Sequence, residues 1–262
     1  MPTLELAHYH LYYEVIGEGK PLIFLHGMGG SINQIKATYR PIEGIRLIVI
    51  DQQGHGQSSM DPQGISFRAL VQDVITVADE LGLDTFDIAG ISMGAAVSLR
   101  VAIEHPLRVS RLCLIRNAWG NGPMSDRFST LFGLLANYLE KQDYEGFVHH
   151  PMYLKLKSES EQATVSLRNF FTETAALKYP QKFKSIPMDR PFERWDQIDK
   201  LSTPALIFAC HHDPVHPFEL GQEIAAHLKN STFYELVSKD IDTKAHLDAL
   251  NHHLAHFLTD KA

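Results

Sequence analysis

Short apolar runs alternate with amphipathic stretches along most of the chain. The runs are rich in Ile, Leu and Val and carry apolar side chains at consecutive positions, as do strands covered on both faces of a parallel sheet. They lie at residues 22–25, 45–50, 86–91, 109–115, 205–210 and 232–237. Ahead of them, the pattern at residues 4–15 predicts an antiparallel hairpin at the edge of the same sheet.

The amphipathic stretches between these runs predict helices at residues 66–81, 92–105, 218–228 and 245–258. The first begins with Ser66, a residue type favoured at helix starts, and places Leu70, Val74 and Val77 on one face. Strands and helices that alternate in this order predict an α/β fold, with an open and mostly parallel eight-stranded sheet flanked by helices.

The alternation stops between residues 115 and 205, after the sixth predicted strand. Only helical patterns occur there, at residues 127–140, 161–174 and 192–198, and 13 of the 25 aromatic residues fall between Trp119 and Trp195. This segment is either a helical subdomain that packs on itself or a lid that lines an apolar pocket over the sheet. We favour the lid and divide the chain into a core (1–118 and 201–262) and a helical cap (119–200).

Composition narrows the class of protein. A chain of 262 residues with 44% hydrophobic and 21% charged residues suits one large α/β domain and excludes wholesale disorder. With 24 basic and 31 acidic residues, the net charge of −7 gives no support to a nucleic-acid or anionic-membrane partner. The two cysteines stand in apolar runs, and neither a signal-peptide pattern nor a stretch of ~20 apolar residues is visible, so we expect a cytoplasmic protein. Oligomeric state is not predictable from the sequence.

The pattern Gly-x-Ser-x-Gly occurs where the predicted strand 86–91 passes into a helix. Its residues are Gly90, Ile91, Ser92, Met93 and Gly94. In a nucleophile elbow, a sharp strand-to-helix turn lifts the serine off the sheet, and glycines two positions away permit close backbone approach. We therefore expect Ser92 to be a nucleophile.

A glycine-rich turn, His26-Gly27-Met28-Gly29-Gly30, follows the predicted strand 22–25. Such a turn directs backbone N–H groups toward the ligand crevice, and we expect the amides of Met28 and Met93 to form an oxyanion hole. The alternative, a phosphate-binding loop, lacks the Lys-Ser/Thr pair that would follow it. We interpret His26 as a structural hydrogen-bonding residue of the turn.

A serine nucleophile needs a general base and an acid that orients the base. Asp213 follows the predicted strand 205–210, and His246 lies near the start of the last helix. The order Ser92, Asp213, His246 is the one found with this type of elbow. These three residues are the predicted catalytic triad, with His252 or His253 as the alternative base.

Other histidines are candidates for metal binding. His211, His212 and His216 surround Asp213, but Pro214 prevents a helical arrangement and no second ligand set follows, so we expect loop residues without a metal. His252 and His256 have helical spacing for zinc, but we assign them to the polar face of a terminal helix.

Together these segments resemble the α/β-hydrolase superfamily, in particular its small lidded esterases and enol-lactonase-type hydrolases. The resemblance rests on the His26-Gly27 loop, residues 51–58, the elbow, the Asp213 loop with Pro214 and Pro217, and His246. Two positions depart from the pattern of the superfamily. Gln53 stands where Arg is common, and Ala245 stands where Gly usually precedes the catalytic His.

The resulting hypothesis is a serine hydrolase that cleaves a carboxylic ester or lactone through an acyl-enzyme, without metal or cofactor. Its substrate would be a small and partly apolar molecule, because the cap is aromatic. C–C bond hydrolysis, thioester hydrolysis and perhydrolysis use the same triad and stay open as alternatives. A non-catalytic small-molecule receptor on the same fold is the alternative from another class of protein.

Overall fold

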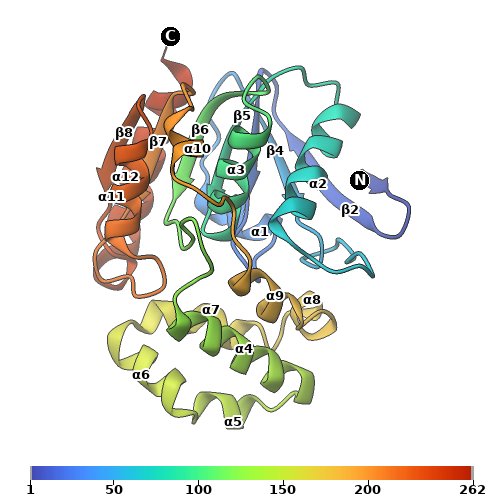
Figure 1. Ribbon diagram of the computed structural model, residues 1–262, viewed down its shortest axis with the longest axis vertical. Coiled ribbons are helices and arrows are strands. Elements are labelled where there is room, and N and C mark those ends of the chain that lie inside the picture. Colours follow the sequence, from blue (N-terminus) through green and yellow to red (C-terminus); the bar gives the residue numbers. More distant parts are fainter. Residues whose placement is uncertain (1, 261–262) are drawn as a thin grey trace.

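The computed structural model describes residues 2–260 and contains an eight-stranded sheet in the order β1-β2-β4-β3-β5-β6-β7-β8 (Figure 1). β1 and β2 pair antiparallel with each other, β2 pairs antiparallel with β4, and the remaining pairs are parallel. The predicted α/β fold with a mostly parallel sheet is therefore confirmed. The strands are β1 (Thr3–Glu5), β2 (His10–Ile16), β3 (Lys20–Leu25), β4 (Ile45–Asp51), β5 (Phe86–Ile91), β6 (Val109–Ile115), β7 (Ala205–Ala209) and β8 (Ser231–Glu235).

Helices cover both faces of the sheet, and each face has its own hydrophobic core. Apolar side chains of α2 (Phe67–Glu80), α3 (Met93–Glu104) and α11 (Phe218–His227) pack on one face. Those of α1 (Ile32–Thr38) and α12 (Lys239–Thr259) pack on the other. Consecutive residues of the central strands point to opposite faces and are buried on both, which explains their continuous apolar runs.

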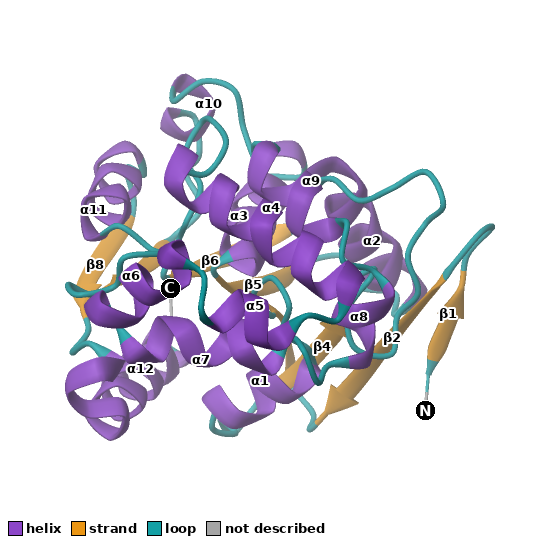
Figure 2. Cartoon of the chain, turned by 90° about the horizontal axis from the view of Figure 1, so that it is seen from below, coloured by secondary structure: helices purple, strands orange, loops and turns teal. Residues whose placement is uncertain are grey.

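Seven helices lie between β6 and β7, in the segment for which the sequence predicts only helices. Figure 1 shows α4 to α9 grouped beyond one end of the sheet, and Figure 2 shows them from below. We call α4 to α10 the inserted helices. They are α4 (Asp126–Lys141), α5 (Tyr144–Val148), α6 (Pro151–Glu159), α7 (Glu161–Asn169), α8 (Thr174–Lys178), α9 (Lys182–Met188) and α10 (Asp196–Asp199).

The last helix differs from its prediction at the N-terminal end. α12 begins at Lys239, six residues before the expected start, but Asp242 within it is non-helical, with φ −154° and ψ 98°. The Asp242 carboxylate accepts a hydrogen bond from the Ala245 amide at 2.9 Å and caps the regular part of the helix. The predicted start at residue 245 thus corresponds to the main body of α12, and a short turn precedes it.

Within residues 2–260, no helix is long and apolar enough to cross a membrane. Cys113 and Cys210 are both buried free thiols.

Candidate active site

Ser92 lies in the turn between β5 and α3 with a strained backbone. Its φ of 55° and ψ of −114° are rare for a residue with a side chain. A Cβ atom on Gly90 would lie 2.1 Å from the carbonyl group of Gly94, and one on Gly94 would lie 2.4 Å from the carbonyl oxygen of Leu25. Both glycines are therefore required by close backbone contacts, and the turn holds the Ser92 hydroxyl above the end of the sheet.

The loop between β7 and α11 carries both an acid and an imidazole. Asp213 and His216 are three residues apart, and His216 Nδ1 lies 2.9 Å from each carboxylate oxygen of Asp213. The backbone amide of His216 also donates to Asp213 Oδ1 at 3.3 Å. Pro214 and Pro217 fix two φ angles of this loop, so the chain itself holds the two groups together.

The imidazole of His216 connects this loop to the elbow. Its Nε2 lies 2.9 Å from Ser92 Oγ. Because Nδ1–H donates to the Asp213 carboxylate, Nε2 is the unprotonated nitrogen and accepts from the Ser92 hydroxyl. The structure thus aligns serine, imidazole and carboxylate in one continuous hydrogen-bonded chain.

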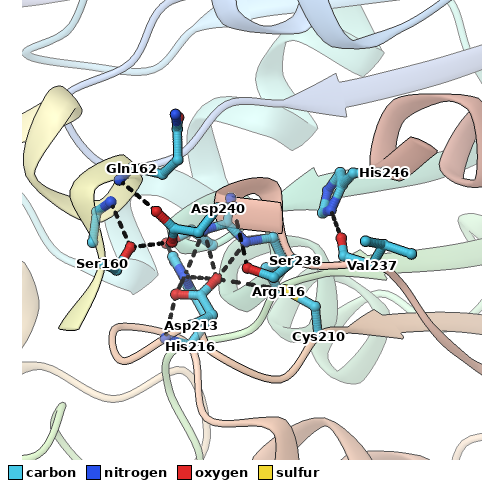
Figure 3. A network of polar contacts seen from close by, with 12 residues as sticks. Arg116, Ser160, Gln162, Cys210, Asp213, His216, Val237, Ser238, Asp240 and His246 are labelled. Carbon is cyan, nitrogen blue, oxygen red and sulfur yellow. Dashed lines mark hydrogen bonds and ion pairs between the residues drawn. The ribbon is translucent and has the colours of Figure 1, made fainter. Parts of the chain in front are cut away.

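Arg116, the first residue after β6, anchors the acid. Its Nε donates to Asp213 Oδ2 at 2.6 Å, and the two side chains form an ion pair (Figure 3). Burial raises the pKa of Asp213, but the adjacent His216 and Arg116 outweigh this effect and hold that pKa well below its usual range. Asp213 is therefore a permanent anion.

The pKa of His216 is lowered from its ordinary value. Burial is the largest cause, Arg116 and Lys239 add to it, and Asp213 opposes it. The imidazole is therefore neutral at pH 7 and can accept a proton from the serine.

The structure does not bring His246 to this chain of hydrogen bonds, and the prediction of His246 as the base needs correction. Its Nδ1 lies 2.8 Å from the carbonyl oxygen of Val237, apart from the cluster around Asp213 (Figure 3). Burial lowers its pKa to about 4. His246 lies in the first turn of the regular part of α12 with its ring buried, and Lys239 belongs to the short turn that precedes it.

His252 and His253, the alternative bases, also lie away from Ser92. They neighbour each other on α12, and the ring of His253 stacks on Tyr234 of β8 at 3.7 Å. Within residues 2–260, no group of three His, Cys, Asp or Glu residues could hold a metal ion.

The sequence interpretation placed His216 among non-catalytic loop residues. The usual order separates acid and base by a strand, so a histidine three residues after the acid did not fit the pattern. A usable signal was nevertheless present. His216 stands between two prolines directly after β7, at the edge of the sheet where β5 also ends.

The glycine-rich turn after β3 lies beside the serine. A Cβ on Gly27 would lie 3.4 Å from the Ser92 Cβ. The backbone N–H groups of Met28 and Met93 make no hydrogen bond to any described residue. Beneath the turn, His26 is fully buried, with Nδ1 donating to Gly27 O at 2.8 Å and Nε2 accepting from the Gln52 amide at 3.0 Å. Of the two free amides, that of Met93 directly follows Ser92 in the chain, and Met28 lines the same cavity as Ser92.

A cavity of about 170 Å³ opens above Ser92 between the sheet and the inserted helices. Apolar side chains of the insertion, including Phe132 and Phe170, form much of its wall. The ring of Phe170 also packs on the glycine-rich turn, because a Cβ on Gly29 would lie 2.3 Å from it. The inserted helices thus contact the glycine-rich turn beside Ser92.

The α/β hydrolase fold family matches residues 20–240. The AB hydrolase superfamily protein YisY of Bacillus subtilis is 25% identical over 241 residues, covering 86% of this chain and 85% of the relative. The 2-hydroxymuconate semialdehyde hydrolase of Pseudomonas putida is 27% identical, covering 83% and 79%. The enol-lactonase structure from Burkholderia xenovorans superposes with a TM-score of 0.76 at 20% identity, covering 99% of this chain and 100% of the other. The chain belongs to the α/β-hydrolase fold family, and hydrolases are among its relatives.

Proposed function

We propose that this protein is a serine hydrolase that cleaves a carboxylic ester or lactone with Ser92, His216 and Asp213. The observation that carries the proposal is the hydrogen-bonded chain from Ser92 Oγ through His216 to Asp213, with 2.9 Å at each link. A neutral imidazole between a hydroxyl and a buried carboxylate is the arrangement that activates serine for attack on a carbonyl.

The reaction has two halves. Ser92 Oγ attacks the carbonyl carbon while His216 Nε2 takes the hydroxyl proton, and the resulting imidazolium is stabilised by Asp213. His216 then donates this proton to the leaving alkoxide oxygen, which leaves an acyl group on Ser92. In the second half, water loses a proton to His216 Nε2 and attacks the acyl carbon, and Ser92 regains its proton as the acid departs.

The amides of Met28 and Met93 provide the oxyanion hole in this proposal. Both N–H groups are without a partner among the described residues. Met93 directly follows Ser92 and Met28 lines the same cavity, so in this proposal the two amides bind the oxygen that becomes negative during attack. Residues 119–200 form a lid over this site, and the aromatic wall of the cavity favours a small, partly apolar acyl group. No step needs a metal or cofactor.

A fluorophosphonate probe tests the proposal, because it phosphonylates an activated serine. We expect labelling of the folded wild type at Ser92, hydrolysis of 4-nitrophenyl butyrate, and loss of both in Ser92→Ala. A folded wild type that neither reacts nor turns over ester would instead support a receptor. A panel of ester, lactone, thioester and β-diketone substrates then identifies the bond that is cleaved.

A further inference from the structure

Lys239 lies in the wall of the cavity above Ser92. It stands a few residues before His246, the base that the superfamily pattern predicts. It is the first residue of α12, directly after the capping residue Ser238. Its side chain lines the same cavity as Ser92 and His216. The segment after β8 therefore contributes an ammonium group to the wall of the cavity, whereas the imidazole beside Ser92 comes from the loop between β7 and α11.

The charges around this cavity do not balance. Arg116, His216 and Lys239 line it, whereas no Asp or Glu of the described chain does. The charge of Arg116 is matched by its ion pair with Asp213. Lys239 Nζ forms neither a hydrogen bond nor an ion pair within residues 2–260. Asp213 attracts its charge, but that carboxylate is already paired with Arg116, so Lys239 has no direct partner among the described residues.

The nearest acidic residue on the same element is already engaged elsewhere. Asp240 accepts hydrogen bonds from the Ser160 hydroxyl and, at 3.0 Å, from the Gln162 amide, and so caps the start of α7 (Figure 3). These bonds hold the Lys239–Asp240 turn against the inserted helices. They also place the Gln162 side chain, which lines the cavity too, close to the same turn.

Burial of an ammonium without a partner is unfavourable. Burial and the nearby Arg116 lower the pKa of Lys239 to about 8, although Asp213 opposes the shift. The group is thus still mostly charged at pH 7. An anion that enters the cavity would offset this cost by pairing with it.

We propose that Lys239 makes this enzyme selective for substrates that carry a carboxylate on the acyl chain, away from the bond that is cleaved. The carboxylate pairs with Lys239 Nζ while the scissile carbonyl lies between Ser92 Oγ and the amides of Met28 and Met93. The apolar wall contacts the methylene groups between them. This inference rests on the proposed function, because it takes Ser92 as the point of attack.

Matched substrates give the first test. The 4-nitrophenyl monoesters of succinate, glutarate and adipate each carry a free carboxylate. In the neutral controls a methyl ester replaces that carboxylate while the 4-nitrophenyl ester is kept, so the shape is nearly the same. The readout is the ratio of kcat/KM for the anionic ester to that for its neutral partner. In wild type we expect this ratio to be well above one for at least one chain length.

Lys239→Met should lower that ratio about ten- to a hundredfold, the usual value of a hydrogen bond to a charged group. Lys239→Arg should keep most of the preference, and Lys239→Glu should lower the ratio further than Lys239→Met. Lys244→Met is the matched control, because Lys244 lies on the same helix but pairs with Asp248 at the surface, and it should leave the ratio unchanged. An equal ratio in wild type and Lys239→Met refutes the selectivity.

Binding separates failure of this inference from failure of the proposed function. Calorimetric titration of the Ser92→Ala variant with monomethyl glutarate and dimethyl glutarate needs no turnover. Tighter binding of the monoanion, lost in the Ser92→Ala/Lys239→Met double variant, supports the anion site even if wild type is not labelled by fluorophosphonate. Equal affinities in an enzyme that is labelled and active overturn the inference and leave the hydrolase in place.

Discussion

Replacement of His216 by alanine should abolish turnover, whereas replacement of His246 should not. His216→Ala removes the imidazole that lies 2.9 Å from Ser92 Oγ and 2.9 Å from Asp213, so no base remains to take the serine proton. Loss of a triad base typically costs at least about 10⁴-fold in kcat/KM, or about 5.5 kcal/mol of transition-state stabilisation. His246→Ala removes a hydrogen bond to Val237 O and a buried ring, which should cost stability of about 1–3 kcal/mol.

Initial rates of 4-nitrophenyl acetate hydrolysis compare the two variants directly, after urea denaturation has confirmed that both are folded. Because burial lowers the pKa of His216 below 6.5, wild-type kcat/KM should already have reached its plateau at pH 7 and should fall only in more acidic buffer. Added imidazole should restore part of the rate to His216→Ala and none to Ser92→Ala. Retention of most activity by His216→Ala, together with its loss in a folded His246→Ala variant, would refute the assignment.

Three other substitutions test separate parts of the structure. Burial raises the pKa of Asp73 to about 7, so the protonated carboxyl stabilises the fold below about pH 4, and this stabilisation is lost as the pH rises through 7. In urea denaturation series from pH 4 to 8, the free energy of unfolding of wild type should therefore fall by on the order of 3 kcal/mol, and Asp73→Asn should flatten this fall. An unchanged dependence of that free energy on pH in Asp73→Asn would contradict the prediction. Gly90→Ala should prevent stable folding, since the new Cβ would lie 2.1 Å from the Gly94 carbonyl, while Gly133→Ala, which meets nothing within 4 Å, should raise the thermal midpoint slightly; similar midpoints would argue against the close contact. Arg116→Met removes a positive charge that lowers the pKa of His216, so the acid limb of the plot of kcat/KM against pH should move to higher pH. A shift of that limb to lower pH would show that the charge of Arg116 does not lower the pKa of His216.

Strand and helix periodicity was enough to predict the sheet. The central strands are buried on both faces and therefore read as continuous apolar runs, and the elbow glycines follow from backbone contacts that no other residue permits. The inserted helices were predicted less well. Residues 192–198 look helical, but the helix there, α10, spans only Asp196–Asp199, since short helices are marginal without tertiary packing.

The sequence did not indicate His216 as the proposed base because its place beside Ser92 depends on where a loop turns, and that is a tertiary property. His211 and His212 are exposed in the same loop, and the two prolines around His216 do not by themselves show which histidine reaches Ser92. The start of α12 at Lys239, with a break at Asp242, removes His246 from the cavity, and no sequence pattern marks that break. At Gln53 the sequence alone did indicate a difference, because Arg is common at this position in the superfamily. In the structure the Gln53 side-chain amide donates to Asp73 Oδ2 at 3.1 Å, so a neutral group faces that carboxyl group.

The short spacing of Asp213 and His216 changes how the catalytic groups are assembled. The predicted pair would have been 246 − 213 = 33 residues apart, whereas the observed pair is 216 − 213 = 3 apart. The entropic cost of closing a loop grows with its length, so the observed pair is easier to bring together in an unfolded chain. The contact between Asp213 and His216 lies within one loop and does not involve the C-terminal helix, whereas the contact of His216 with Ser92 joins two loops that follow different strands of the sheet.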